Sequence, residues 1–259
     1  MKGILWVLAL AALGSSSQKG SRFESVDHFW WLVRDVQATG AFFRDTLGFT
    51  LGPDVLYPFA DLRHVWFEDG TFLELVSQPA ARPALGEAVS AFLRVHEGAW
   101  KMGIFVNDVS EVARDLKARG LRVSEPSGGT WQGLGARKDL PEEMWTGIDL
   151  LQSPGHLAYF WHFTPGWDQM RARMPEVDPL GTQFTQHANT ALGFRTPWLA
   201  TWDLERARRD FGFLKAREGE PFDVPHLLAQ GRWLELERGR ILLLSPEDDE
   251  GPVMEFLFT

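Results

Sequence analysis

The side chains able to do acid–base or metal chemistry in this 259-residue chain are 7 histidines and 35 acidic residues, and no cysteine is present. The lack of cysteine excludes disulfides, thiolate zinc sites, iron–sulfur clusters and a cysteine nucleophile. A serine nucleophile is not indicated either, since the sequence contains no G-x-S-x-G turn. Any metal would therefore be held by histidine, aspartate or glutamate.

Two of these residues stand out because they lie inside apolar, strand-like runs. His28 lies in VDHFWWLV, and Glu74 lies in TFLELVS, where a carboxylate is costly to bury unless it is paired or metal-bound. Strand alternation puts His28 and Trp30 on one face, and Glu74 on a face with Phe72. The alternatives are a hydrogen-bonded strand histidine and a solvent-facing glutamate.

The segments that carry these residues belong to a unit that recurs in the order strand, helix, weak strand and hairpin. The strand 26–36 ends in Asp-Val, a helix follows that stops at Gly48, and a hairpin turns at Glu68-Asp69-Gly70. A weak strand is expected near 50–57. The copies have little sequence identity, so an ordinary α+β chain with recurring Asp-Val turns is the alternative.

The second and third copies have the same order of strand, helix and glycine helix stop. The second copy opens with 102–109 and its helix stops at Gly120. The third opens with 196–204, has a shorter helix that stops at Gly212, and closes with a hairpin over 232–246. The recurrence predicts a chain built from three such units.

The N-terminus and the overall charge indicate the compartment and the class of partner. Residues 1–20 have a positive residue, Lys2, then the apolar run 4–13 and a stretch of small residues after it, as in a signal peptide. We expect an exported protein, periplasmic or extracellular, with no integral membrane span after processing; a cytoplasmic protein with an N-terminal extension is the alternative. The net charge of −9 disfavours nucleic acid as a partner.

The tandem units, opened by Asp27-His28 and closed by GTFLEL at 70–75, resemble the vicinal oxygen chelate superfamily, and within it the glyoxalase-like branch. The resemblance implies an α+β fold of tandem βαβββ units, two of which form a glyoxalase-like barrel or cup. It places a glyoxalase-like domain at 24–190, with units at 24–80 and 100–165 plus a linker. A third, shortened βαβββ-like unit would occupy 191–259.

The same resemblance implies a divalent metal at the floor of the cup, bound by the first and last strands of the paired units. Carried over by position, His28 and Glu74 are the ligands of the first unit, and His162 is aligned with Glu74 in the second. Two imidazoles and a carboxylate suit Fe, Mn, Ni or Zn. Glu74 is also the candidate catalytic proton carrier. Lys101 occupies the position that corresponds to His28, and a protonated lysine is a poor ligand.

Candidate substrate contacts are Trp30, His64, Trp66, Lys101 and His187. His64 precedes Glu74 by one strand and lies either in the cup or on the outer surface, while aromatic strand residues are often simply core. We expect a small organic substrate and a lyase, isomerase or ring-cleaving dioxygenase reaction. The alternatives are a metal-free binding protein with an aromatic cup, as in resistance-type members of the superfamily, and a structural protein that assembles as a homodimer.

Overall fold

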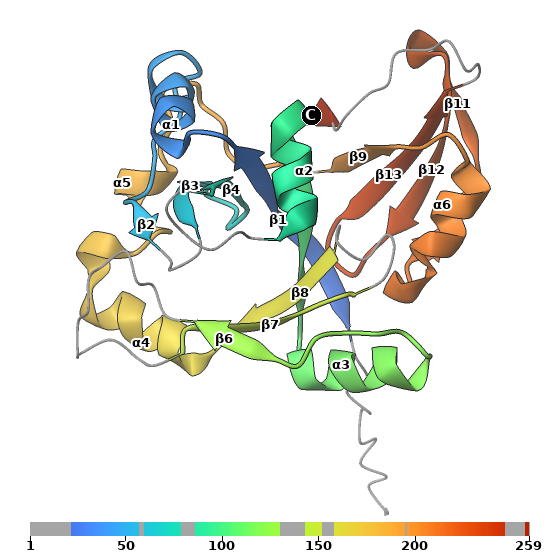
Figure 1. Ribbon diagram of the computed structural model, residues 1–259, viewed down its shortest axis with the longest axis horizontal. Helices are drawn as coiled ribbons and strands as arrows, with labels where there is room; N and C mark the ends of the chain where they lie inside the picture. The colour runs from blue at the N-terminus through green and yellow to red at the C-terminus, as the bar shows by residue number, and fades with distance from the viewer. Residues whose placement is uncertain are drawn as a thin grey trace, which may run out of the picture.

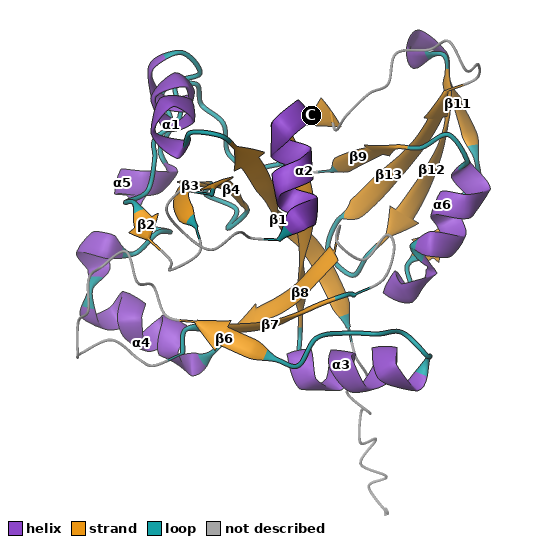
Figure 2. Ribbon diagram, in the orientation of Figure 1, coloured by secondary structure: helices purple, strands orange, loops and turns teal. Residues whose placement is uncertain are grey.

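The computed structural model describes residues 22–56, 60–78, 86–129, 143–151, 158–194, 196–246 and 257–258, and the predicted signal peptide at 1–20 lies outside them. Within the described ranges the chain forms an α+β structure with two sheets (Figures 1 and 2). None of the helices in these ranges is long and apolar enough to cross a membrane.

The first unit runs from β1 to β4 and contains α1. Its elements are β1 (Phe23–Val33), α1 (Val36–Asp45), β2 (Val55–Leu56), β3 (Asp61–Trp66) and β4 (Phe72–Ser77). The carboxylate of Asp35 accepts the N–H groups of Gln37 and Ala38 and so caps the start of α1. Gly48, with φ of +75°, turns the chain after the helix as expected. The hairpin then returns β4 parallel to β1.

The second unit repeats this plan. Its elements are β5 (Gly98–Val106), α3 (Val109–Ala118), β6 (Ser127–Gly129), β7 (Trp145–Asp149) and β8 (Ala158–Phe163). Asp108 caps α3 through the N–H of Glu111, and Gly120 has a φ of +79°. β8 pairs in parallel with β5, as β4 does with β1.

The two units are joined through their first strands, β1 and β5, which pair antiparallel. The sheet therefore has the order β2-β3-β4-β1-β5-β8-β7-β6, and it curls so that β3 and β4 face β6–β8 (Figure 1). His28 pairs with Gly103 and Trp30 pairs with Lys101. These two pairs are related by an approximate two-fold axis, which equates His28 with Lys101 and Trp30 with Gly103.

The third unit forms the second sheet, with the order β10-β12-β13-β9-β14. Its elements are β9 (Pro197–Ala200), α6 (Leu204–Asp210), β10 (Arg217–Glu218), β11 (Phe222–Val224), β12 (Ala229–Glu235), β13 (Arg240–Pro246) and β14 (Leu257–Phe258). β13 runs parallel to β9, so the βαβββ order recurs, and α6 has 7 residues where α1 and α3 each have 10. This confirms the predicted fold class with its shortened third unit.

One helix stop differs from the sequence expectation. Gly212 does not turn the chain in the left-handed region but begins a short 3₁₀ helix, Gly212–Leu214. Lys215, with φ of 51°, takes the left-handed position instead. The shortened helix therefore ends through a 3₁₀ turn, which often closes helices.

Strand alternation gives the first sheet an apolar core on each of its two faces, and a smaller apolar cluster lies in the second sheet. The convex face of the first sheet packs under α1, α3 and the third unit, with Phe29, Leu75 and Ile104 among its buried residues. The concave face has its own apolar cluster, to which α2 (Glu87–Val95) and α4 (Pro165–Arg173) contribute Val89 and Trp167. α5 (Thr182–Thr185) lies in the segment that leads to the third unit. The concave core is the place where a cavity remains.

Candidate functional site

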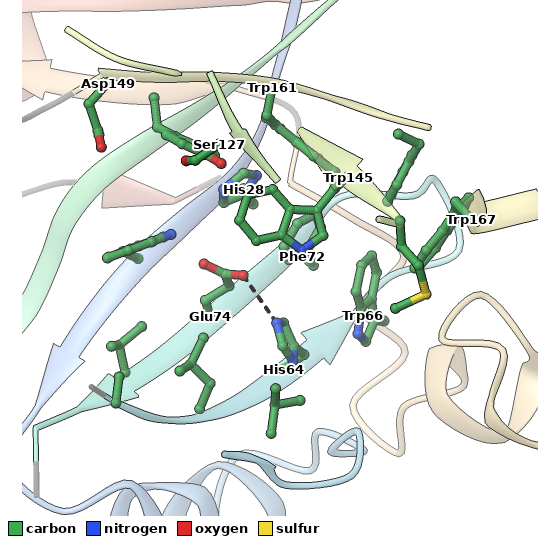
Figure 3. Close-up of a pocket in the computed structure, with 18 residues that line it drawn as sticks. His28, His64, Trp66, Phe72, Glu74, Ser127, Trp145, Asp149, Trp161 and Trp167 are labelled. Atoms are coloured by element: carbon green, nitrogen blue, oxygen red, sulfur yellow. Dashed lines mark hydrogen bonds and ion pairs between the residues drawn. The ribbon is translucent and has the colours of Figure 1, made fainter. Parts of the chain in front are cut away.

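A cavity of about 240 Å³ lies within the curl of the first sheet. Both units line it, the first from β1, β3 and β4 and the second from β6, β7 and β8, and α4 contributes Trp167. Its walls are strongly aromatic, with Trp66, Phe72, Trp145, Trp161, Phe163 and Trp167 among the lining residues (Figure 3). A concave, mainly apolar cavity with a few polar groups is the usual form of a small-molecule site.

Glu74 is a carboxylate of the first unit that lines this cavity, and it is held by His64. The two residues face each other across β3 and β4, and 3.1 Å separates His64 Nε2 from Glu74 Oε1. Burial alone would raise the pKa of Glu74, but the hydrogen bond from His64 and the nearby basic groups of His28, His64 and Lys101 hold it below its ordinary value. Glu74 is therefore an ionised carboxylate inside an aromatic cavity.

His28 lies on β1 above Glu74 and is part of a second carboxylate–histidine pair (Figure 3). Its Nδ1 lies 3.0 Å from Asp27 Oδ1, which also accepts the indole N–H of Trp161 at 3.0 Å. A register shift in β1 between Val26 and His28 accompanies this contact between consecutive side chains. Burial raises the pKa of Asp27 although both hydrogen bonds oppose the rise.

The two units meet at the paired strands β1 and β5, which form the seam between them. The imidazole of His28 crosses this seam because its partner on β5 is a glycine, Gly103. A Cβ on Gly103 would lie 1.9 Å from His28 Cε1, which is too close for any side chain. On the unit-one side the ring stacks on Phe72 with centroids 4.4 Å apart. Gly103 thus gives His28 the space to reach the middle of the cavity.

Lys101 lies beside the cavity at the position related to His28 by the approximate axis. Its ammonium is 2.6 Å from Asp149 Oδ1 and 4.7 Å from the centre of the Trp30 ring. Asp149 and Trp30 both line the cavity. The second unit therefore contributes an ion pair where the first contributes a histidine.

Five of the residues chosen from sequence come together. The same cavity is lined by His28, Glu74, His64, Trp30 and Trp66. His64 therefore lies inside the cup. Asp27 and Tyr159 were not among the candidates. The Asp27-His28 dipeptide was visible in the sequence, but a regular strand would point these neighbours to opposite faces.

His162 does not join His28 and Glu74. Its Nδ1 accepts the N–H of Val109 at the start of α3 at 3.2 Å, on the face opposite to that of Trp161. The strand pairing shows why: Glu74 pairs with Trp30, and Tyr159 pairs with Gly103, the counterpart of Trp30. Tyr159 is thus the equivalent of Glu74, and the alignment with His162 was three residues too far. An odd shift moves a side chain to the other face of a strand.

His187 also lies away from the cavity, so the prediction of a substrate contact is not supported by its position. Its Nδ1 accepts the backbone N–H of Thr50 at 2.9 Å, and its ring lies against Phe49 and Phe67. Burial lowers its pKa, which favours the neutral form needed for an acceptor. His187 thereby attaches the segment before the third unit to the first unit.

The side chains around the cavity do not match the three-ligand metal centre expected from sequence. His162 faces away, and the corresponding positions of the second unit hold Lys101 and Tyr159. His64, the additional histidine, has its Nε2 on Glu74. In the described part of the chain, no group of three or more histidine, aspartate or glutamate side chains is arranged to hold a metal ion.

The fold and the cavity together define a class of protein in which paired βαβββ units enclose a small-molecule site. A family model described as a glyoxalase-like domain matches residues 26–211. The chain belongs to this glyoxalase-like family, which confirms the predicted resemblance to the glyoxalase-like branch. No curated protein sequence matches the chain.

Solved structures with a similar fold include a hypothetical protein from Staphylococcus aureus, with 8% identity and a TM-score of 0.55 over 90% of this chain and 89% of that one. Methylmalonyl-CoA epimerase from Streptomyces coelicolor is 20% identical, with a TM-score of 0.41 over 54% of this chain and 94% of that one. The epimerase from Mycobacterium tuberculosis is 16% identical, with a TM-score of 0.43 over 57% and 94%. The Staphylococcus aureus structure supports the fold.

Proposed function

We propose that this protein binds a small organic molecule with an aromatic or otherwise apolar body in the cavity, and that Glu74 accepts a hydrogen bond or a proton from it. The observation that carries the proposal is the ionised carboxylate of Glu74, fixed by His64 among aromatic walls. Apolar walls bind the body of a ligand, and a few placed polar groups orient it.

Two activities are compatible with this site. As a base, Glu74 would remove a proton from an acidic O–H, N–H or C–H group, and His64 would stabilise the carboxylate before the transfer. As a binding group alone, Glu74 would only accept a hydrogen bond, and the protein would sequester its ligand. Because its pKa is lowered, Glu74 is ionised and can accept a proton as a base, whereas an acid would need a proton to donate.

The proposal does not depend on a metal. The donor set predicted for Fe, Mn, Ni or Zn is not assembled among the described residues, and the ammonium of Lys101 already supplies a positive charge that lowers the pKa of Glu74. Ligand binding should therefore survive treatment of the protein with a chelator. Binding that is lost on chelation and restored by one of these metals would favour the metal centre instead.

The test is a screen of small phenols, anilines, nitrogen heterocycles and carboxylic acids against the full chain, followed by tryptophan fluorescence. Trp66, Trp145, Trp161 and Trp167 line the cavity, so a bound ligand should change the emission. For a compound that binds, Glu74→Gln should weaken the affinity by about tenfold or more, the scale of one hydrogen bond to a charged group. The base activity is read separately, as exchange of a carbon-bound ligand hydrogen for solvent deuterium at a rate above that without protein.

The matched control is Glu125→Gln, which alters a glutamate whose side chain is 85% exposed and paired with Lys117. This variant should bind as the wild type does. Equal affinities for the wild type and Glu74→Gln would overturn the proposal. Binding without hydrogen exchange would assign the sequestering role.

A further inference from the structure

The hydrogen bonds around Asp27 determine which nitrogen of His28 carries a proton. An indole N–H can only donate, so the Trp161 contact makes Asp27 Oδ1 an acceptor. The same oxygen lies 3.0 Å from His28 Nδ1. The ionised carboxylate of Asp27 has no proton to give, so His28 donates to it from Nδ1, and in the neutral ring the proton is absent from Nε2.

The ring that carries this Nε2 is fixed in orientation. Phe72 stacks on it with an interplanar angle of 13°, and Trp161 meets it edge-on with centroids 5.1 Å apart. Gly103 lies against Cε1, so even a methyl group there would displace the ring. Asp27 is buried, and the side chain of His28 is 3% exposed. His28 lines the cavity, and Nδ1 points to Asp27, so Nε2 is the nitrogen available to a ligand.

We infer that His28, positioned by Asp27, presents an unprotonated Nε2 to the cavity as a second hydrogen-bond acceptor beside Glu74. A site with two fixed acceptors in aromatic walls is complementary to an aromatic ligand that carries at least two N–H or O–H donors. A ligand with fewer donors would leave a buried acceptor unpaired, which weakens binding. The choice of ligand class rests on the proposed function of Glu74, whereas the tautomer of His28 does not.

The tautomer is tested in the ligand-free protein by long-range ¹H–¹⁵N NMR at about pH 8, where an ordinary histidine is neutral. In the wild type, Nδ1 of His28 should carry the proton and Nε2 should have the shift of an unprotonated nitrogen. A wild-type spectrum with the proton on Nε2 would overturn the inference without any variant.

The role of Asp27 is tested with the double variant Asp27→Leu with Trp161→Phe, which removes the acceptor and the indole donor together and leaves neither unpaired. His28 should then change to the Nε2-protonated tautomer or a mixture of the two. Trp161→Phe alone and Asp27→Asn keep an acceptor oxygen and should retain the wild-type tautomer. An unchanged tautomer in the double variant would show that Asp27 does not position His28.

The ligand class is tested with 3-aminophenol, 3-methoxyaniline and 3-methoxy-N,N-dimethylaniline, which carry two, one and no donor groups on the same ring. Their affinities should fall by about tenfold at each step. In His28→Phe, which keeps a flat apolar ring, 3-aminophenol and 3-methoxyaniline should bind about equally. Equal binding of all three by the wild type, or binding of none, would overturn the ligand class. If Glu74→Gln alone has no effect, the function proposed for Glu74 fails while the His28 assignment stands.

Discussion

The two halves of the cavity share a backbone plan but differ in chemistry. The first unit contributes a histidine–glutamate pair, His64 and Glu74, and a histidine oriented by a carboxylate. The second unit contributes mainly rings, with Tyr159 at the position equivalent to Glu74 and Lys101 at the position equivalent to His28. The comparison teaches that a repeated unit can keep its shape while acid–base groups concentrate in one copy.

The difference is clearest at the seam, where both units must share space. Equivalent positions hold Trp30 in β1 and Gly103 in β5, so a large ring in one unit corresponds to no side chain in the other. His28 occupies the space above Gly103, and Trp30 lies beneath the ammonium of Lys101. The asymmetry is therefore steric as well as electrostatic.

The largest expected effect comes from filling the space above Gly103. In Gly103→Ala the new Cβ would overlap His28, whose ring is confined by Phe72, so we expect a loss of about 2–3 kcal/mol in the free energy of unfolding. The measurement is urea unfolding followed by circular dichroism. Gly212→Ala, in which the added Cβ would have no heavy atom of the described residues within 4 Å beyond its chain neighbours, should change stability by less than about 0.5 kcal/mol. Similar losses in both variants would contradict the steric account of the seam.

The second-largest effect is expected from removing the hydrogen bond between the units, which Trp161 donates to Asp27. Trp161→Phe keeps an aromatic ring but removes the N–H that Asp27 accepts, and should cost about 1–3 kcal/mol because a buried acceptor loses a partner. Thermal or urea unfolding measures the loss. Trp202→Phe is the control, since Trp202 is 55% exposed, and it should leave stability nearly unchanged. An equal effect of the two changes would mean that the bond from Trp161 to Asp27 contributes little.

Glu74 and Asp27 should respond to pH in opposite directions. The pKa of Glu74 is lowered on folding, so its favourable contribution is present above the ordinary value of 4.5 and is lost as the pH falls through the folded value. The pKa of Asp27 is raised, so its ionisation opposes folding as the pH rises from 3.8 through the folded value. Glu74→Gln should thus cost about 1–2 kcal/mol near neutral pH and less in acid.

For Asp27→Asn the stability relative to the wild type should increase with pH, by an amount on the order of 1 kcal/mol. Urea unfolding at a series of pH values between about 3 and 7 measures both differences, with Glu125→Gln as the exposed control. Parallel pH profiles for Glu74→Gln and Asp27→Asn would contradict the opposite environments of the two carboxylates.

The smallest effect is expected from His162, which lies on the face of β8 away from the cavity. His162→Gln keeps a polar group near the N–H of Val109 and should change ligand affinity by less than about twofold. His64→Gln alters the partner of Glu74 and should weaken the same ligand further. A greater loss of affinity in His162→Gln than in His64→Gln would restore His162 as a site residue.

The local chemistry of the sequence predicted much of the fold. The first strands of the two units end close to Asp35 and Asp108 as predicted, Gly48 and Gly120 take the left-handed turns, and the alternation of β1 and β4 turns His28 and Glu74 toward the cavity. Each of these inferences depends on residues close together in the chain, where helix stops and alternation are determined by local geometry.

The parts that sequence did not predict depend on register and on long-range contacts. A three-residue difference in alignment was enough to put His162 on the wrong face, because residue type alone does not determine which residues of two strands correspond. Asp27 meets His28 where the register of β1 shifts, and its second partner, Trp161, is 134 residues away. Similarly, His187 reaches Thr50 across 137 residues, so its role could not be read from its own segment.

The glycine at the seam also has a consequence for how this protein and its relatives diverge. The ring of His28 and a side chain at position 103 compete for one volume, so the two positions cannot enlarge independently. Relatives with a small residue at position 28 should tolerate bulk at position 103, and relatives with a ring at position 28 should keep glycine there. A histidine at position 28 therefore requires glycine at position 103, which couples the two positions.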